Sequence, residues 1–388
     1  MDSFIPKHLQ DEVKARVSRL ALLLNNAGVE AMLVCDNVGL YYLSGRVFAG
    51  YILVGQDASA RYFVRRPVGF SGVDYIRKPE QIAEIVGTVP ATLALQLDTL
   101  SVADYNRLSK AFAGASIVDA SGMMRQLRSV KSQYEIELMR ACGVKHVEAY
   151  SHIPEVYHPG MTDVDLQIEI ERLLRKHGCL GLFRVHGQSM ELFMANILCG
   201  ANADNASPYD FAMGGAGQDL SLPVGADGTT IASGNAVMVD ACGNFNGYMT
   251  DMTRTYAVGE LPEPALRAHR VSIEINRRIA QEGKAGVEAK RLYEISLEMA
   301  QQAGLDDYFM GHRQKAGFVG HGVGIEINEA PVLAPRSRDV LAVGNVIAVE
   351  PKFVIPGVGA VGIENTYVVT ESGMECITLA PEAITPLD

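Results

Sequence analysis

The sequence predicts an α/β protein of two domains, in which a small α/β domain precedes a larger α+β domain built on an antiparallel sheet. The chain has 388 residues, which is too long for one ordinary hydrophobic core. Strand-like and helix-like segments alternate over residues 1–124, whereas strand-like segments joined by short glycine-containing connections mark the remainder. We therefore place the first domain at residues 1–124 and the second at residues 125–388.

The first domain is expected to open with a helix, because the apolar residues between positions 9 and 26 keep helical spacing and Gly28 follows as a stop. Helical patterns recur at residues 79–85 and 103–112. Short apolar runs predict strands at residues 31–34, 51–54, 61–64 and 92–96.

In the second domain, a basic, turn-like segment within RQLRSVKSQYEIELMRA leads into a helix from about Ser132 to Tyr150. Thr162 to Asp165 resembles a capping box and opens a helix that ends near Lys176. Further helices are expected at residues 263–279 and 291–303, and strands at residues 235–240, 248–258, 346–353 and 365–370. Short connections between these strands favour antiparallel pairing, with helices flanking the sheet.

Charge and composition exclude several classes of partner. The chain carries 34 basic and 45 acidic residues, a formal net charge of -11, and no cluster of Lys and Arg offsets it. Such a chain repels phosphate backbones and anionic lipid surfaces, so we expect neither nucleic acid nor membrane as a partner. The N-terminal residues show no apolar leader segment, which predicts a cytoplasmic protein. The six cysteines form no CxxC pair, so we expect neither disulfides nor thiolate metal sites.

Four segments place acidic residues or a histidine within apolar, strand-like sequence. VMVDACGNFNGYMTDMTRTYAVG contains Asp240 and Asp251, FVGHGVGIEINEAP contains His321, and VIAVEPKF and VGIENTYVVT contain Glu350 and Glu364. A carboxylate in the middle of an apolar strand is costly to bury unless it is paired or binds a cation. A surface hairpin would explain the two aspartates alone, but it does not explain the other three segments.

Four carboxylates and one imidazole form a mostly oxygen donor set, which suits divalent ions such as Mn, Co or Zn. Five donors exceed the need of one tetrahedral ion, so the sequence predicts two divalent ions that share bridging carboxylates and a water. Ions in this arrangement acidify the water and polarise a scissile carbonyl, and the expected reaction is therefore hydrolysis.

The same segments resemble, in order, the motifs of prolidases and aminopeptidase P, the metallopeptidases with the pita-bread fold. VDACGNFNGYMTD with MTRT is similar to that family's VDxGxxxxGYxxDxTRT segment, and GHGVGIEINEAP to its GHGxGxxxHExP segment. AVEP and GIENTYVVTESG match two further motifs, and RVSRLALLLNNAGVEAMLV is similar to the opening of the creatinase-like N-terminal domain.

The resemblance implies a creatinase-like domain followed by a pita-bread catalytic domain, in a protein that is commonly a homodimer. It also implies roles for the five donors. Asp240 would chelate one metal ion and Asp251 and Glu364 would bridge both, while His321 and Glu350 would each ligate one ion and Glu350 would double as proton shuttle.

The sequence departs from the family pattern around these donors. Asn328 stands where the family has its second histidine, Gly362 where it has an arginine, and Lys352 where it has the glycine after the EP dipeptide. The segment ILCGANADNASPYDF also lacks a family histidine, with Ser207 and Tyr209 nearby. We therefore name Tyr209 and Asn328, with His186 as a replacement histidine, as candidate substrate-binding residues.

Three functions follow from these observations. The leading one is a metallohydrolase of the Xaa-Pro dipeptidase or aminopeptidase type that cleaves a peptide or peptide-like amide in a small substrate, with proline dipeptides and tripeptides expected to be poor substrates. A related C–N hydrolase acting on a creatine-like or ectoine-like substrate is the second. A non-catalytic binding protein is the third, and the retention of all five donors disfavours it.

Overall fold

The computed structural model describes residues 2–187, 190–211 and 213–388. The chain forms two compact units, Met1–Arg128 and Ser129–Asp388. The boundary that the sequence suggests, after residue 124, lies within helix α5 (Ser121–Ser129) and stays a prediction. No helix among these described ranges has the length and apolarity needed to cross a bilayer.

The first unit is built on a mixed six-stranded sheet with the strand order β6-β4-β3-β2-β7-β8. Strand β2 pairs antiparallel with β3 and parallel with β7. The elements of this unit before α5 are β1 (Asp2–Ser3), a 3-10 turn (Lys7–Leu9), α1 (Gln10–Ala27), β2 (Ala31–Val34), α2 (Asn37–Ser44), β3 (Ala49–Gly55), β4 (Ala60–Arg66), β5 (Phe70–Ser71), β6 (Asp74–Tyr75), α3 (Glu80–Val86), β7 (Thr92–Leu95), α4 (Val102–Ala111) and β8 (Ser116–Asp119). Gly28 ends α1 in the left-handed conformation, as its position in the sequence predicts.

The second unit combines a four-stranded sheet, β19-β11-β10-β9, with a five-stranded sheet, β13-β12-β14-β17-β18, and a hairpin of β15 and β16. Its helices are α6 (Gln133–Ser151), α7 (Ile153–Val156), α8 (Asp163–Lys176), a 3-10 turn (Gly200–Asp204), α9 (Glu263–Glu282) and α10 (Ala289–Gln302). Its strands are β9 (Ala195–Cys199), β10 (Ala236–Asn244), β11 (Met249–Ala257), β12 (Gly320–Gly322), β13 (Glu329–Leu333), β14 (Val346–Val349), β15 (Lys352–Ile355), β16 (Gly359–Gly362), β17 (Asn365–Val369), β18 (Met374–Cys376) and β19 (Thr385–Pro386).

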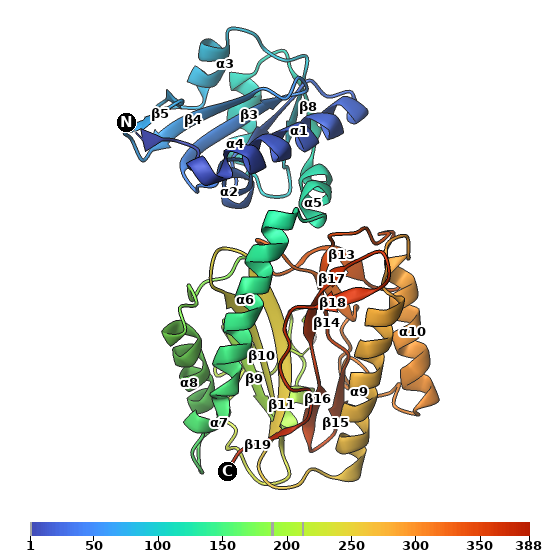
Figure 1. Cartoon of the computed structure of the whole chain (residues 1–388). Coiled ribbons are helices and arrows are strands. Elements are labelled where there is room, and N and C mark those ends of the chain that lie inside the picture. The colour runs from blue at the N-terminus through green and yellow to red at the C-terminus, as the bar shows by residue number, and fades with distance from the viewer. Residues whose placement is uncertain (1, 188–189, 212) are drawn as a thin grey trace. The chain divides into compact units, whose positions relative to one another are not determined.

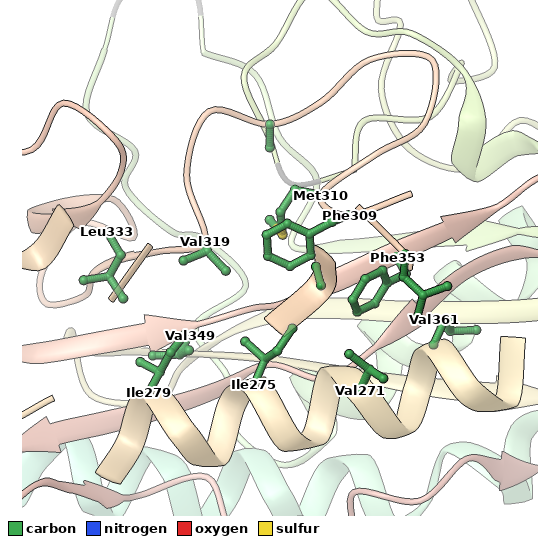
Figure 2. Packing of buried hydrophobic residues seen from close by; sticks show 14 of the residues in the cluster. Val271, Ile275, Ile279, Phe309, Met310, Val319, Leu333, Val349, Phe353 and Val361 are labelled. Atoms are coloured by element: carbon green, nitrogen blue, oxygen red, sulfur yellow. The ribbon is translucent and has the colours of Figure 1, made fainter. Parts of the chain in front are cut away.

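Helices flank the strands of the second unit on two sides, with α6 and α8 beside β9 to β11 and with α9 and α10 beside β14 to β16 (Figure 1). Each side has its own hydrophobic core. In one core, Val271, Ile275 and Ile279 of α9 face Val349 and Phe353 across the packed interior (Figure 2). The predicted α/β domain and the predicted antiparallel sheet flanked by helices are therefore confirmed.

Two local expectations differ from the structure. The segment expected to be a basic turn before residue 132 includes helix α5, whose buried Met124 and Leu127 are three residues apart on one face. The strand expected over residues 346–353 is two strands, β14 and β15, because the chain leaves one sheet after Val349 and enters the β15–β16 hairpin at Lys352. That break holds Glu350 and Pro351.

Candidate metal centre

Two predicted donors lie on the β10–β11 hairpin. Asp240 pairs with Thr253 across the hairpin, and Asp251 pairs with Cys242. Residues opposite one another in an antiparallel pair share a face, and so do residues two apart on one strand. Asp240 and Asp251 are therefore diagonal neighbours on the same face of the sheet.

The two glutamates lie where the chain passes between sheets. Glu350 directly follows β14 and Glu364 directly precedes β17, and the last pair of this ladder joins Val349 to Asn365. The Glu364 backbone amide donates to the Thr253 carbonyl at 3.1 Å. This bond ties the end of one sheet to the hairpin that carries the aspartates.

His321 comes from β12, which pairs with β14. A Cβ on the preceding residue, Gly320, would lie 2.5 Å from the Ala348 carbonyl oxygen, so glycine is needed for this close approach. The Nε2 atom of His321 lies 3.5 Å from Glu350 Oε1 and 3.7 Å from Asp251 Oδ2. Its Nδ1 atom lies 3.2 Å from the Gly322 carbonyl oxygen, a contact that favours a proton on Nδ1 and a free lone pair on Nε2.

All five predicted donors thus come together from four separate segments. Their ligand atoms form two groups, each with its atoms within 4.8 Å of one another. One group contains Asp251, His321 and Glu364, and the other contains Asp240, Glu350 and Glu364.

The electrostatics of the first group favour a cation. Burial, together with repulsion from Asp240 and Glu350, raises the pKa of Asp251 well above its usual value. Burial and the charge of Asp251 likewise raise the pKa of Glu364. Glu364 Oε1 is buried and has no hydrogen-bond partner among the described residues. A divalent ion bound by this group would satisfy that oxygen and offset the repulsion, so these residues fit a metal ion.

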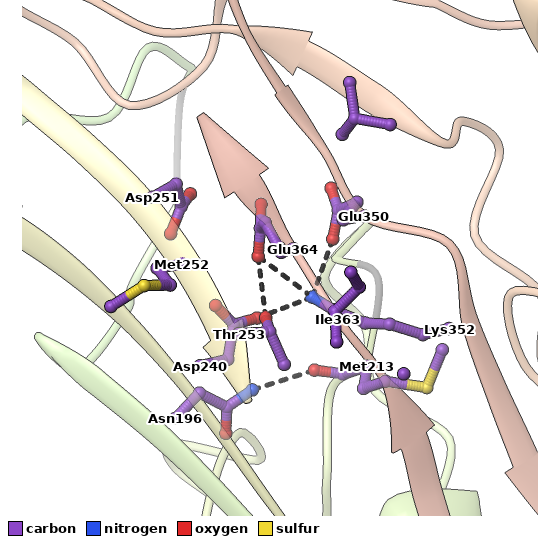
Figure 3. A network of polar contacts seen from close by, with 12 residues as sticks. Asn196, Met213, Asp240, Asp251, Met252, Thr253, Glu350, Lys352, Ile363 and Glu364 are labelled. Atoms are coloured by element: carbon purple, nitrogen blue, oxygen red, sulfur yellow. Dashed lines mark hydrogen bonds and ion pairs between the residues drawn. The ribbon is translucent and has the colours of Figure 1, made fainter. Parts of the chain in front are cut away.

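The second group already surrounds a cation, the ammonium of Lys352, which is fully buried (Figure 3). Lys352 Nζ donates to Glu350 Oε2 at 2.8 Å, to Asp240 Oδ2 at 2.9 Å and to Glu364 Oε2 at 3.3 Å. Burial alone lowers the pKa of this lysine, but the three carboxylates outweigh burial and hold the pKa well above its usual value. The sequence marks Lys352 only as a departure from a family glycine, and we did not predict that it belongs to the centre.

A cavity of about 340 Å³ opens onto the cluster. Its lining includes Asp240, Asp251, His321, Glu350 and Glu364, and one further acidic residue, Asp210. The other lining side chains are mostly apolar, among them Phe183, Val185, Met190, Leu192, Phe193, Met194, Phe211, Met213, Phe318, Ile327 and Val332. Within the described part of the chain, no lysine or arginine is among the residues that line it.

The three candidate substrate residues lie in different surroundings. Asn328 lines the cavity, but its amide is engaged, because Oδ1 accepts from the His186 amide at 2.7 Å and Nδ2 donates to the His186 carbonyl at 2.8 Å. The His186 side chain lies 3.7 Å from Glu326 and does not line the cavity.

Tyr209 donates to Glu191 at 2.9 Å, stacks on Phe211 and lines a separate pocket. The substrate-binding roles of these residues remain predictions.

Comparison with known proteins finds relatives that match this chain over nearly its whole length. The Xaa-Pro dipeptidase of Pyrococcus furiosus is 26% identical over 376 residues, which cover 94% of this chain and 98% of that protein. The solved Xaa-Pro dipeptidase from Bacillus anthracis superposes with a TM-score of 0.81 at 26% identity and covers 97% of this chain and 100% of its own. The solved prolidase from Pyrococcus furiosus superposes with a TM-score of 0.75 at 25% identity, over 93% and 99% of the two chains.

Family profiles cover both units. The Creatinase/Prolidase N-terminal domain matches residues 16–130. The profile of metallopeptidase family M24 matches residues 137–371, which include all five predicted donors. The resemblance drawn from the motifs is confirmed, as is the prediction of an enzyme of the metallopeptidase class. This chain belongs to metallopeptidase family M24.

Proposed function

We propose that this chain is a metal-dependent hydrolase that cleaves an amide bond in a small substrate at the end of the cavity. The observation that carries the proposal is the convergence of Asp251, His321 and Glu364 around one point, with Glu364 Oε1 buried and unpartnered among the described residues. A divalent ion bound there supplies two things, an acidified water and a polarised scissile carbonyl. The similarity to Xaa-Pro dipeptidases over nearly the whole chain supports an amide as the substrate.

The side chains around this point divide the remaining tasks. His321 presents Nε2 to the ligand position while the Gly322 carbonyl fixes its ring. Glu350 directs Oε1 towards the same position and has its Oε2 held by Lys352. We therefore keep Glu350 as the proton shuttle, since its free oxygen faces the place where the attacking water and the leaving amine would lie.

The cavity lining indicates the class of substrate. A dipeptide ends in a carboxylate, and burying that carboxylate without a cation is costly. The residues lining this cavity provide acidic groups and apolar surface but no lysine or arginine in the described part of the chain. We propose that the enzyme prefers apolar substrates with a free amino group and a neutral carboxyl side, such as amino-acid amides or longer peptides. The same reasoning disfavours creatine and ectoine, because each carries a carboxylate.

Matched substrate pairs test this proposal. Steady-state kinetics on Mn- or Co-loaded protein would compare Ala-Pro and Phe-Pro with their carboxyl amides and with Ala-Leu and its amide, alongside creatine and ectoine. We expect each neutral amide to have at least a ~10-fold higher kcat/KM than its free acid, since ~1.4 kcal/mol of uncompensated charge corresponds to that factor. Free Xaa-Pro acids cleaved above ~10⁴ M⁻¹s⁻¹ would contradict the proposed specificity. No turnover on any substrate would favour a binding protein.

The predicted homodimer and the predicted cytoplasmic location are kept as proposals. The predicted ion count depends on Lys352, whose ammonium lies among three of the predicted donors.

A further inference from the structure

The Lys352 ammonium occupies the space among three carboxylates that could otherwise hold a metal ion. Asp240, Glu350 and Glu364 form one of the two potential ligand groups, and each places an oxygen within 3.3 Å of Lys352 Nζ. An ammonium has three protons, and each carboxylate accepts one (Figure 3). The lysine therefore satisfies this group in the way that a bound cation would.

The backbone fixes Lys352 in this place. Glu350 and Lys352 flank Pro351 at the break between β14 and β15, and their side chains meet in the cluster (Figure 3). Lys352 pairs with Gly362 across the β15–β16 hairpin, and its carbonyl accepts from the Met310 amide at 2.9 Å. Gly362 has a φ of +146°, and a Cβ there would lie 2.6 Å from the Pro351 carbonyl oxygen. The glycine thus permits the close packing that carries the lysine into the cluster.

The two oxygens of Glu364 have different partners. Oε2 accepts from Thr253 at 2.7 Å and from Lys352 at 3.3 Å, whereas Oε1 is buried with no partner among the described residues. Asp251 Oδ2 and His321 Nε2 lie near one another on the other side of the cluster, 3.7 Å apart. One side of the cluster is thus filled by an ammonium, and the other side presents the ligand atoms of Asp251, His321 and Glu364.

We propose that Lys352 replaces one of the two divalent ions expected from the sequence, and that the centre binds a single divalent ion through Asp251, His321 and Glu364. The four carboxylates of the cluster are balanced in part by the ammonium and in part by this ion. A second dication among Asp240, Glu350 and Glu364 would have to displace Nζ or lie in direct repulsive contact with it.

The proposal goes beyond the proposed function and rests on it only in that a divalent ion binds this cluster. Its test is therefore metal content rather than activity. Purified protein would be stripped of metal, reconstituted with Mn or Co, freed of unbound ion and measured by elemental analysis. Isothermal titration would give the stoichiometry independently. Anomalous diffraction from Mn-loaded crystals would locate each ion.

We expect about one ion per chain in the wild type, located beside His321, and about two in Lys352→Gly, where the ammonium is absent. Lys352→Ala is the second variant, in case the glycine destabilises β15. Lys131→Ala is the matched control, since Lys131 is also buried and pairs with Glu329 at 3.0 Å, outside the cluster. That variant should keep about one ion even if it loses stability.

Two ions in the wild type would overturn the inference but leave the proposed function intact. No bound ion in the wild type would overturn both. A single ion in folded Lys352→Gly and Lys352→Ala would show that the lysine does not exclude the second ion, and would also overturn the inference. An anomalous peak among Asp240, Glu350 and Glu364 in the wild type would contradict the assigned position.

Discussion

The Asn328 amide holds one wall of the cavity, and removing it should loosen that wall. Asn328 makes a paired hydrogen bond with the His186 backbone, at 2.7 and 2.8 Å, and the neighbouring Ile327 amide donates to the Arg184 carbonyl at 2.8 Å. Phe183 and Val185 of the held segment line the cavity. In Asn328→Ala both side-chain bonds are lost, at a net cost of about 1 kcal/mol each.

This loss of ~2 kcal/mol corresponds to a fall in Tm of roughly 4 to 8 °C for a unit of this size. Asn328→His should behave similarly, because an imidazole cannot both accept from and donate to one backbone residue in the plane of the amide pair. It should also fail to create proline dipeptidase activity.

Differential scanning calorimetry would measure Tm, with Gln302→Ala, an exposed amide at the end of α10, as control. KM for a neutral substrate should rise in Asn328→Ala, since Phe183 and Val185 lose their fixed position. An unchanged Tm in Asn328→Ala would refute the reasoning. Efficient Ala-Pro hydrolysis by Asn328→His would show instead that the position serves substrate recognition directly.

Two further predictions concern the metal ligands and Arg254, which holds the backbone at Glu364. Asp251→Ala should lose more metal than Glu350→Gln, because Asp251 is a ligand of the proposed ion whereas Glu350 belongs to the group around the Lys352 ammonium. Equal losses by elemental analysis would refute this difference. Arg254→Ala should lower the free energy of unfolding by ~3 to 5 kcal/mol in urea titrations, since this buried guanidinium donates to the Glu364 carbonyl at 2.8 Å and to five other acceptors. Arg172→Ala removes an exposed ion pair and is the control for Arg254→Ala. It should change the free energy of unfolding by less than ~1 kcal/mol. Similar effects in both variants would argue against a structural role for Arg254 beside Glu364.

Elements with a clear amphipathic period were predictable from the sequence, and elements without one were not. Helix α9 buries Ala268, Ser272, Ile275 and Ile279 on one face, and the prediction for residues 263–279 follows that pattern. Helix α2 was missed because most of its residues are buried, so its sequence lacks the polar face that marks a surface helix. The break between β14 and β15 was missed because apolar residues continue on both sides of it.

The sequence was enough to predict the donor set, because carboxylates within apolar strands are costly to bury unless they are paired or bind a cation. It also determined which family positions are altered. The consequence of the change at Lys352 became visible only in the fold. A lysine after a Glu-Pro pair is expected at the surface, but strand register against Gly362 directs Lys352 inward, onto three carboxylates distant in sequence. Contacts between residues far apart in the chain depend on sheet order and register, which local sequence patterns do not encode.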